Sequence, residues 1–149
     1  MGWFEFIAAF AVFMGIHAVP SRPGLKAALV AGLGLRGYAV VFSLVSTGLL
    51  AWLIVAAGRA PYVELWPQAG WMRWLVNGVM PLAVVLATYG VAAPNPFAFE
   101  GRADGFDPDH PGIAGVVRQP LLWALGLWGG VHLLVNGDLA HAILFGAFA

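Results

Sequence analysis

The chain has 149 residues, of which 61% are hydrophobic and 9% charged, and its mean hydropathy is +0.85. Soluble domains carry about 25% charged residues, so this composition excludes an ordinary water-soluble globule and indicates an integral membrane protein. The formal net charge is zero and basic residues do not cluster, which argues against a nucleic-acid-binding protein. The absence of cysteine excludes disulfides, thiolate metal sites and iron–sulfur ligation.

Five apolar segments follow one another along the chain. A membrane-spanning helix needs about 20 mostly apolar residues, and four segments approach this length: residues 3–19, 38–57, 74–93 and 120–135. A fifth, residues 139–149, is too short to cross a hydrocarbon core about 30 Å thick at about 1.5 Å per residue. We therefore predict an all-α, polytopic transmembrane bundle of about five helices in one domain, with the last helix truncated.

Prolines and glycines mark the connections between these segments. Pro20 and Pro23 are expected to end the first helix. The connector that follows, residues 20–36, contains an apolar stretch at residues 25–35 that predicts an interfacial helix. Asn136-Gly137-Asp138 is typical of a turn between the fourth and fifth segments.

The longest polar loop covers residues 97–118. It contains several acidic residues and a histidine: Asp104, Asp107, Asp109 and His110. Oxygen ligands of this kind can bind a hard cation, but their spacing does not match an EF-hand loop. We therefore interpret this segment as a solvated acidic loop.

The distribution of Lys and Arg predicts the orientation in the membrane. If the four segments alternate in direction, the first and third connectors share one side. Together these connectors carry five basic residues and the second carries two: Arg22, Lys26, Arg36, Arg102 and Arg118 against Arg59 and Arg73. The positive-inside rule then puts the five in the cytoplasm and the N-terminus outside.

Two histidines lie in apolar segments, His17 near the end of the first and His132 within the fourth. Ionisable residues inside a bilayer are rare and costly, and they mark functional sites. Neutral imidazole is a common ligand of haem iron, so the pair suggests a haem site. The alternatives are a backbone hydrogen bond for His17 and interhelical hydrogen bonding for His132. The two positions differ in depth by roughly 15 Å, so a shared iron requires a tilted helix or a flat-lying haem.

Two further side chains lie near the ends of the last helices. Arg118 precedes Pro120 at the mouth of the fourth segment, where its guanidinium can bind a propionate or phosphate, or extend to the interface. His141 begins the fifth segment and is interpreted as an interfacial histidine.

Two groups of residues resemble the NnrU family, and together they cover nearly the whole chain. The first group is His17-Ala18-Val19-Pro20-Ser21-Arg22-Pro23, Leu33-Gly34, Tyr38 and Phe42-Ser43-Leu44. The second is Gly112-Ile113, Arg118-Gln119-Pro120, Leu122-Trp123, Trp128, residues 132–138 and Leu144-Phe145-Gly146. The family usually has Arg-His-Pro where this chain has Arg118-Gln119-Pro120, and glutamine is a poor haem ligand.

This resemblance implies a multi-pass protein of the bacterial inner membrane. NnrU proteins are associated with nitrite and nitric oxide metabolism, and they are similar to the zeta-carotene isomerases, which carry haem b and isomerise a carotenoid double bond. The resemblance therefore implies a haem b ligated by His17 and His132. From its own chemistry and position, Arg118 is expected near a propionate. It also implies nitric oxide or an apolar small molecule as the substrate.

Two other functions remain open at this point. The Arg-x-Pro start of the fourth helix is also similar to the motif with which membrane methyltransferases bind S-adenosylmethionine. The second alternative is a non-enzymatic helical subunit that acts as a scaffold or delivers haem to a membrane protein partner.

Overall fold

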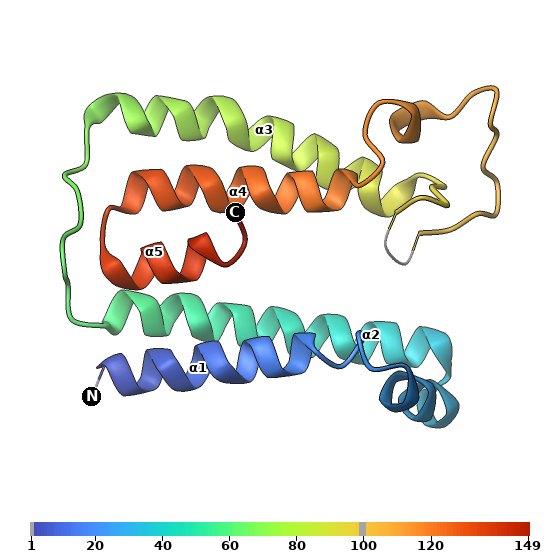
Figure 1. The fold of residues 1–149 in the computed structure, drawn as a ribbon, viewed down its shortest axis with the longest axis horizontal. Helices are drawn as coiled ribbons and strands as arrows, with labels where there is room; N and C mark the ends of the chain where they lie inside the picture. Colours follow the sequence, from blue (N-terminus) through green and yellow to red (C-terminus); the bar gives the residue numbers. More distant parts are fainter. Residues whose placement is uncertain (1, 99–100) are drawn as a thin grey trace. The chain divides into compact units, whose positions relative to one another are not determined.

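The computed structural model describes residues 2–98 and 101–149 (Figure 1). Within these residues the chain forms five α-helices and a short 3₁₀ helix: α1 (Gly2–His17), α2 (Pro23–Arg59), α3 (Gly70–Ala92), η1 (Gly112–Gly115), α4 (Pro120–Asn136) and α5 (Leu139–Gly146). The predicted all-helical fold of about five helices is therefore confirmed. The chain divides between Val63 and Glu64 into two compact units, and each is described by itself.

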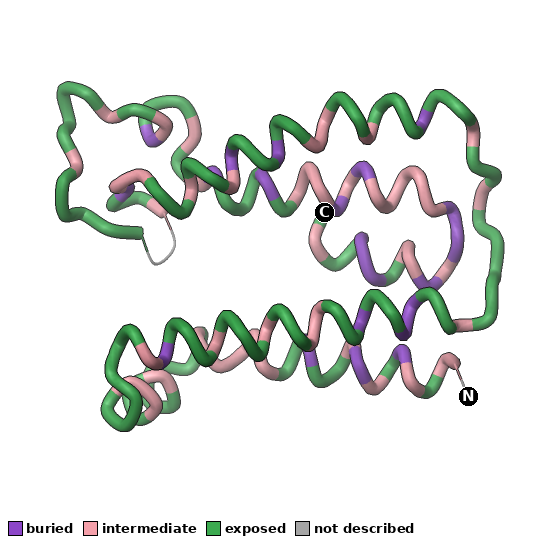
Figure 2. Tube along the Cα trace, turned by 180° about the vertical axis from the view of Figure 1, so that it is seen from behind, coloured by how far each residue is buried: buried purple, intermediate pink, exposed green. Residues whose placement is uncertain are grey.

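Two of the helices, α2 and α3, are long and apolar enough to cross a membrane. Only 11% of the most apolar stretch of each is buried, whereas the core helix of a soluble protein would be mostly covered. Figure 2 shows most of both helices as exposed. Their exposed side chains are largely hydrophobic, which is the surface that lipid would cover.

The other two predicted spans are shorter than expected. Helices α1 and α4 are apolar but have 16 and 17 residues, which corresponds to about 24–26 Å at 1.5 Å per residue. This is less than the hydrocarbon core of about 30 Å. Residues 2–98 and 101–149 thus contain two candidate spans, where the sequence predicted four.

The connector predicted at residues 20–36 is largely helical, because α2 already begins at Pro23. Proline suits the first turn of a helix, where its fixed φ is favourable and its missing N–H has no partner to lose. The helix is interrupted at Gly34, whose φ of 71° and ψ of 161° are not helical. The predicted interfacial segment and the second span are therefore two parts of one long helix on either side of this kink.

In the first unit, α1 packs antiparallel to the later part of α2 (Figure 1). Three residues of α1, three and four positions apart, form its buried stripe: Phe6, Ala9 and Phe13. Where α1 begins and α2 ends, Gly2 approaches the Arg59 carbonyl so closely that any Cβ would clash with it. Glu5 pairs with Arg59 at the same end, with 3.3 Å between the charged atoms.

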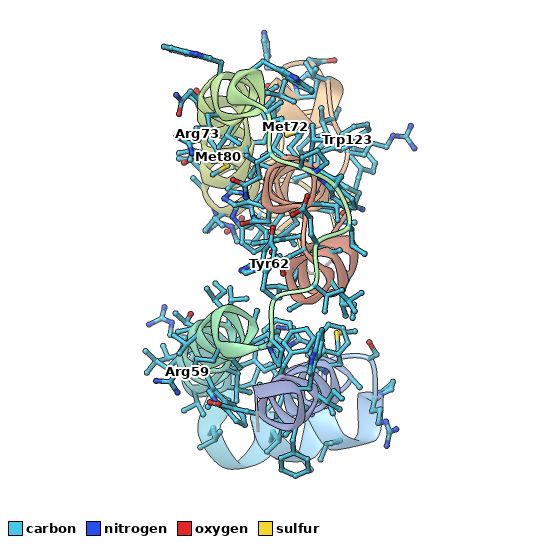
Figure 3. The ribbon with its side chains drawn as sticks, turned by 90° about the vertical axis from the view of Figure 1, so that its left-hand side faces the viewer. Arg59, Tyr62, Met72, Arg73, Met80 and Trp123 are labelled. Atoms are coloured by element: carbon cyan, nitrogen blue, oxygen red, sulfur yellow. The ribbon has the colours of Figure 1, made fainter. Side chains whose placement is uncertain are left out.

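In the second unit, α3 and α4 lie antiparallel, and α5 returns along α4 (Figure 1). Alanines at the contact between α3 and α4, Ala83 and Ala124, are buried and allow the helices to approach closely. Figure 3 looks along these helices; Trp123 of α4 is 60% exposed, while Met72 of α3 is buried. Helix α3 continues through Pro81, which an apolar helix tolerates where neighbouring groups satisfy the freed carbonyl.

The segment before α3 holds the turn between α4 and α5. The backbone N–H groups of Leu65 and Trp66 both donate to the Gly137 carbonyl, at 2.8 and 3.1 Å. The Trp66 indole donates to the Leu134 carbonyl at 2.8 Å, and the Gln68 side chain donates to the Asn136 carbonyl at 3.1 Å. The last carbonyls of a helix have no partner within it, so this segment satisfies the end of α4.

Gly137 makes this arrangement possible, and its replacement should destabilise the second unit. Its φ is 67°, and a Cβ there would clash with the Trp66 carbonyl. We expect Gly137→Ala to lower the free energy of unfolding by about 1–3 kcal/mol. Thermal unfolding in detergent, followed by circular dichroism, measures this change.

Gly126 in α4 provides the matched control, because a Cβ there would meet nothing within 4 Å. Gly126→Ala should leave the stability unchanged or raise it by up to about 1 kcal/mol, since alanine is the better helix former. Equal unfolding temperatures for the two variants would show that residue 137 does not need a left-handed backbone.

Candidate functional site

His17, the last residue of α1, hydrogen-bonds backwards along its own helix. Its Nδ1 lies 2.8 Å from the Phe13 carbonyl oxygen. A carbonyl oxygen can only accept, so Nδ1 carries the proton and Nε2 keeps its lone pair. The ring packs against Phe13 at 4.1 Å and against Phe42 of α2 at 5.6 Å between ring centroids.

His132, in α4, repeats this arrangement. Its Nδ1 lies 2.8 Å from the Trp128 carbonyl oxygen, which again leaves Nε2 as the nitrogen with a free lone pair. Its ring contacts Trp128 at 5.4 Å and Phe145 of α5 at 5.0 Å. The Asn136 side chain donates to the His132 carbonyl at 2.7 Å and fastens the following turn.

His17 therefore makes the backbone hydrogen bond of its alternative interpretation, whereas His132 bonds a carbonyl of its own helix and not of a neighbouring helix. Each satisfies one ring nitrogen with a backbone carbonyl, and histidines that bind metals commonly fix their second nitrogen in this way. His17 belongs to the first unit and His132 to the second, so their pairing on one iron stays a prediction.

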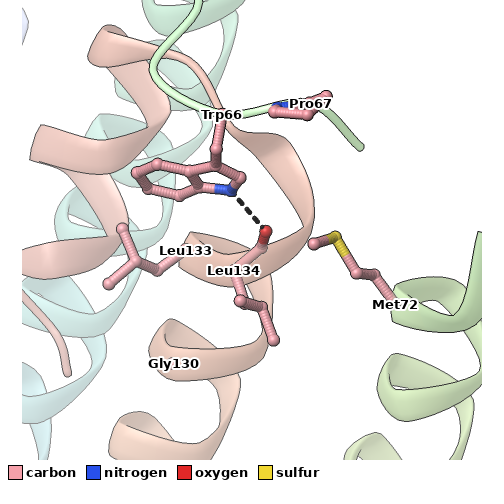
Figure 4. Close-up of a pocket in the computed structure, with 6 residues that line it drawn as sticks. All are labelled: Trp66, Pro67, Met72, Gly130, Leu133 and Leu134. Carbon is pink, nitrogen blue, oxygen red and sulfur yellow. Dashed lines mark hydrogen bonds between the residues drawn. The ribbon is translucent and has the colours of Figure 1, made fainter. Parts of the chain in front are cut away.

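Several pockets lie along α4, and two of them are near His132 in the sequence. One, of about 210 Å³, lies between α3 and α4 and is lined in part by Met80, Leu125 and Trp128, one turn before His132. The other, of about 620 Å³, is open and lies under the Trp66 indole (Figure 4). It is lined by Trp66, Pro67, Met72, Gly130, Leu133 and Leu134. Since residues two apart in a helix point about 200° from each other, His132 faces away from this second pocket.

His141 is held by a buried carboxylate that the sequence interpretation missed. Asp138 is 7% exposed and caps α5; its carboxylate accepts from the His141 backbone N–H at 3.2 Å and lies 2.7 Å from His141 Nδ1. The His141 ring also stacks on Phe145. The Asp-x-x-His spacing at a helix start is the signal that would have predicted this pair, as in a capping box.

Arg118 is exposed and lies over an aromatic ring at the start of α4. Its guanidinium is 5.6 Å from the centroid of Phe97, and its carbonyl accepts from the side chain of the buried Asn95 at 3.0 Å. Gln119 donates to the Phe97 carbonyl at 2.7 Å. These contacts fasten the long loop to α4 and leave the Arg118 charge at the surface.

In the acidic loop, Asp107 is engaged by its neighbours. Its carboxylate lies 2.9 Å from His110 Nδ1 and accepts from the Asp109 backbone N–H at 2.9 Å. These hydrogen bonds, that of His110 first, hold the pKa of the Asp107 carboxyl below its usual 3.8. Within the described residues, no group of three or more His, Asp or Glu side chains has the geometry of a metal site.

The cause of the lowered pKa of Asp107 can be tested by removing the His110 side chain. Because the folded-state value is depressed, any stability from these hydrogen bonds is present above the unfolded-state pKa near 3.8. It is lost as the pH falls through the lower folded-state value. In His110→Ala, the pKa of Asp107 should rise towards 3.8, as measured by a carboxyl-carbon NMR titration. His141→Ala is the control, and an unchanged Asp107 titration in His110→Ala would contradict the assignment.

Comparison with known proteins gives one result for the whole chain. The NnrU protein family model matches residues 5–149, which include both units and all the histidines considered above. No curated protein and no solved structure matches the chain. Since the family match covers nearly its full length, this chain belongs to the NnrU family.

Proposed function

We propose that this NnrU protein binds haem b through His17 and His132. The observation that supports this is the shared geometry of the two imidazoles, each with Nδ1 on a backbone carbonyl and Nε2 carrying the lone pair. Two neutral imidazoles could hold the iron of a b-type haem.

The surroundings of these residues fit such a group. Aromatic rings flank both histidines, with Phe13 and Phe42 beside His17, and Trp128 and Phe145 beside His132. Aromatic side chains suit the faces of a flat, largely apolar macrocycle. The exposed guanidinium of Arg118 is available for a carboxylate such as a propionate.

We place the protein in the bacterial inner membrane as a multi-pass protein, with the basic connectors in the cytoplasm. When bound, the haem would supply an iron that changes redox state and binds small ligands. The residues of the chain would hold the macrocycle and exclude water around it. The substrate class is nitric oxide or an apolar molecule, and the open pocket under Trp66 has room for the latter.

The absorption spectrum of the detergent-purified protein, oxidised and then reduced with dithionite, tests the proposal. We expect a Soret band, with sharp α and β bands on reduction, as for a six-coordinate b haem. In His17→Ala and in His132→Ala this band should shift or disappear, because each variant removes one iron ligand. Added imidazole should restore it in part, which separates ligand loss from misfolding.

His110→Ala is the control for these variants, since His110 lies in the exposed loop and is paired with Asp107. Its spectrum should match the unsubstituted protein. A flat visible spectrum from protein expressed with haem available would refute haem binding. A band that survives in His132→Ala and is lost in His141→Ala would move the second ligand to the histidine beside Asp138.

A further inference from the structure

The part of α2 before the kink, residues 23–33, runs in a different direction from the rest of the helix; we call it the arm. In Figure 1 the arm is seen nearly end-on at the lower right, whereas the later part of α2 lies across the view. Figure 3, turned by 90°, shows the reverse. Gly34 makes this corner with a φ of 71°, which side chains larger than glycine rarely adopt. The arm therefore lies across the apolar helix that follows it.

One face of the arm packs within the first unit. Leu29 and Leu33 line the same apolar pocket as Ile16 of α1 and Val19 of the turn after it. Tyr38, just after the kink, is buried at this pocket, and within the described residues its hydroxyl has no hydrogen-bond partner. The contact is thus apolar and closed to solvent, and it fixes the direction of the arm.

The rest of the arm is exposed but has almost no polar side chain. Leu25 is 45% exposed, and Ala28 and Ala31 are exposed as well. Between residues 24 and 35 the sequence contains one polar side chain, that of Lys26. A helix that is apolar on all sides belongs in a protein core or in lipid. Since the first unit covers one face only, the remaining surface needs an apolar environment.

The length of α2 decides where the arm can find this environment. The 25 residues after Gly34 extend for about 37 Å, which already exceeds a hydrocarbon core of about 30 Å. Their exposed side chains are largely hydrophobic and suit lipid. The arm leaves the end of this helix sideways, so it meets the same bilayer at its surface and not in its centre.

The charges at this end of the unit suit a membrane surface. Arg22 and Arg36 flank the arm and both are exposed. Residues 6–63 contain no Asp or Glu, and Glu5 lies at the other end of the helix pair, paired with Arg59. A basic side chain near an anionic leaflet gains about 1 kcal/mol. Lipid phosphates would therefore meet the two arginines without competition from a carboxylate.

We propose that the arm is an interfacial helix that lies in the plane of an anionic membrane leaflet. Its exposed leucines contact the ends of the acyl chains, and Arg22 and Arg36 contact the lipid phosphates. Lipid covers the arm because the same lipid covers the continuous apolar surface of α2 beyond Gly34. The proposal is independent of the proposed haem ligands.

Spin-label depth measurements on the full chain in phosphatidylglycerol vesicles test this placement. The chain has no cysteine, so single-cysteine variants can be labelled one at a time. Labels are placed in the arm by Leu25→Cys, Ala28→Cys and Ala31→Cys, and after the kink by Val40→Cys and Leu44→Cys. Accessibility to oxygen and to a water-soluble nickel chelate gives the depth of each label. We expect nearly equal, shallow depths in the arm, and a difference of about 6 Å between positions 40 and 44.

The corner itself is tested by two glycine variants. Gly34→Ala disfavours the positive φ and should give the arm labels unequal depths, because the arm turns towards the axis of the later helix. Gly32→Ala is the matched control, since a Cβ there meets nothing within 4 Å, and it should leave all depths unchanged.

Three results would overturn the proposal. The first is a steady depth gradient through the arm in the unsubstituted background, which means that the arm continues into the core. The second is arm labels that neither quencher reaches, which means that a second copy or another protein covers the arm. The third is the same depth in phosphatidylcholine vesicles, where the arm should instead become more accessible to the chelate. None of these results depends on the Soret band, so the haem proposal succeeds or fails separately.

Discussion

The structure depends on how polar side chains are satisfied within apolar helices. Four of them bond the backbone carbonyl one turn earlier: His17 to Phe13, Thr88 to Val84, His132 to Trp128 and Asn136 to His132. Where lipid replaces water, the i−4 carbonyl is the nearest acceptor, so a helix can carry such groups without a partner helix. For an imidazole this bond also fixes the tautomer. The same contact that makes a histidine tolerable in an apolar helix prepares its other nitrogen as a ligand.

Much of the fold was predictable because apolar runs and prolines are local signals. The sequence alone indicated an all-helical chain, the helix ends near His17 and Ala92, and the turn at Gly137. A helix at residues 25–35 is predicted from the sequence, but its start at Pro23 and its continuity with the second apolar segment are not, because Pro23 occupies the first turn of α2 instead of ending a helix. The division into two candidate spans could not be predicted either. The lengths of α1 and α4 depend on where their caps form, and hydropathy alone does not fix this.

For the candidate site, the sequence indicates which residue types to consider but not how they are arranged. His17, His132 and Arg118 stood out because ionisable groups are unusual in apolar segments. Which ring nitrogen is protonated depends on a carbonyl four residues away, and the sequence offers no sign of that bond. The Asp-x-x-His spacing of Asp138 and His141 can be read from the sequence. The burial of this pair cannot, because it depends on α4 and on the segment before α3. The unpartnered hydroxyl of Tyr38 is a property of the packed structure, since it requires knowing every neighbour that could have accepted.

The break at Gly34 determines how α2 can match a bilayer. A straight helix of 37 residues would be about 55 Å long, nearly twice the hydrocarbon thickness. The part after the kink alone is about 37 Å, which a modest tilt accommodates. The part before it is then free to turn aside with its basic residues. In a bilayer, this one glycine would therefore spare the rest of the helix a severe hydrophobic mismatch.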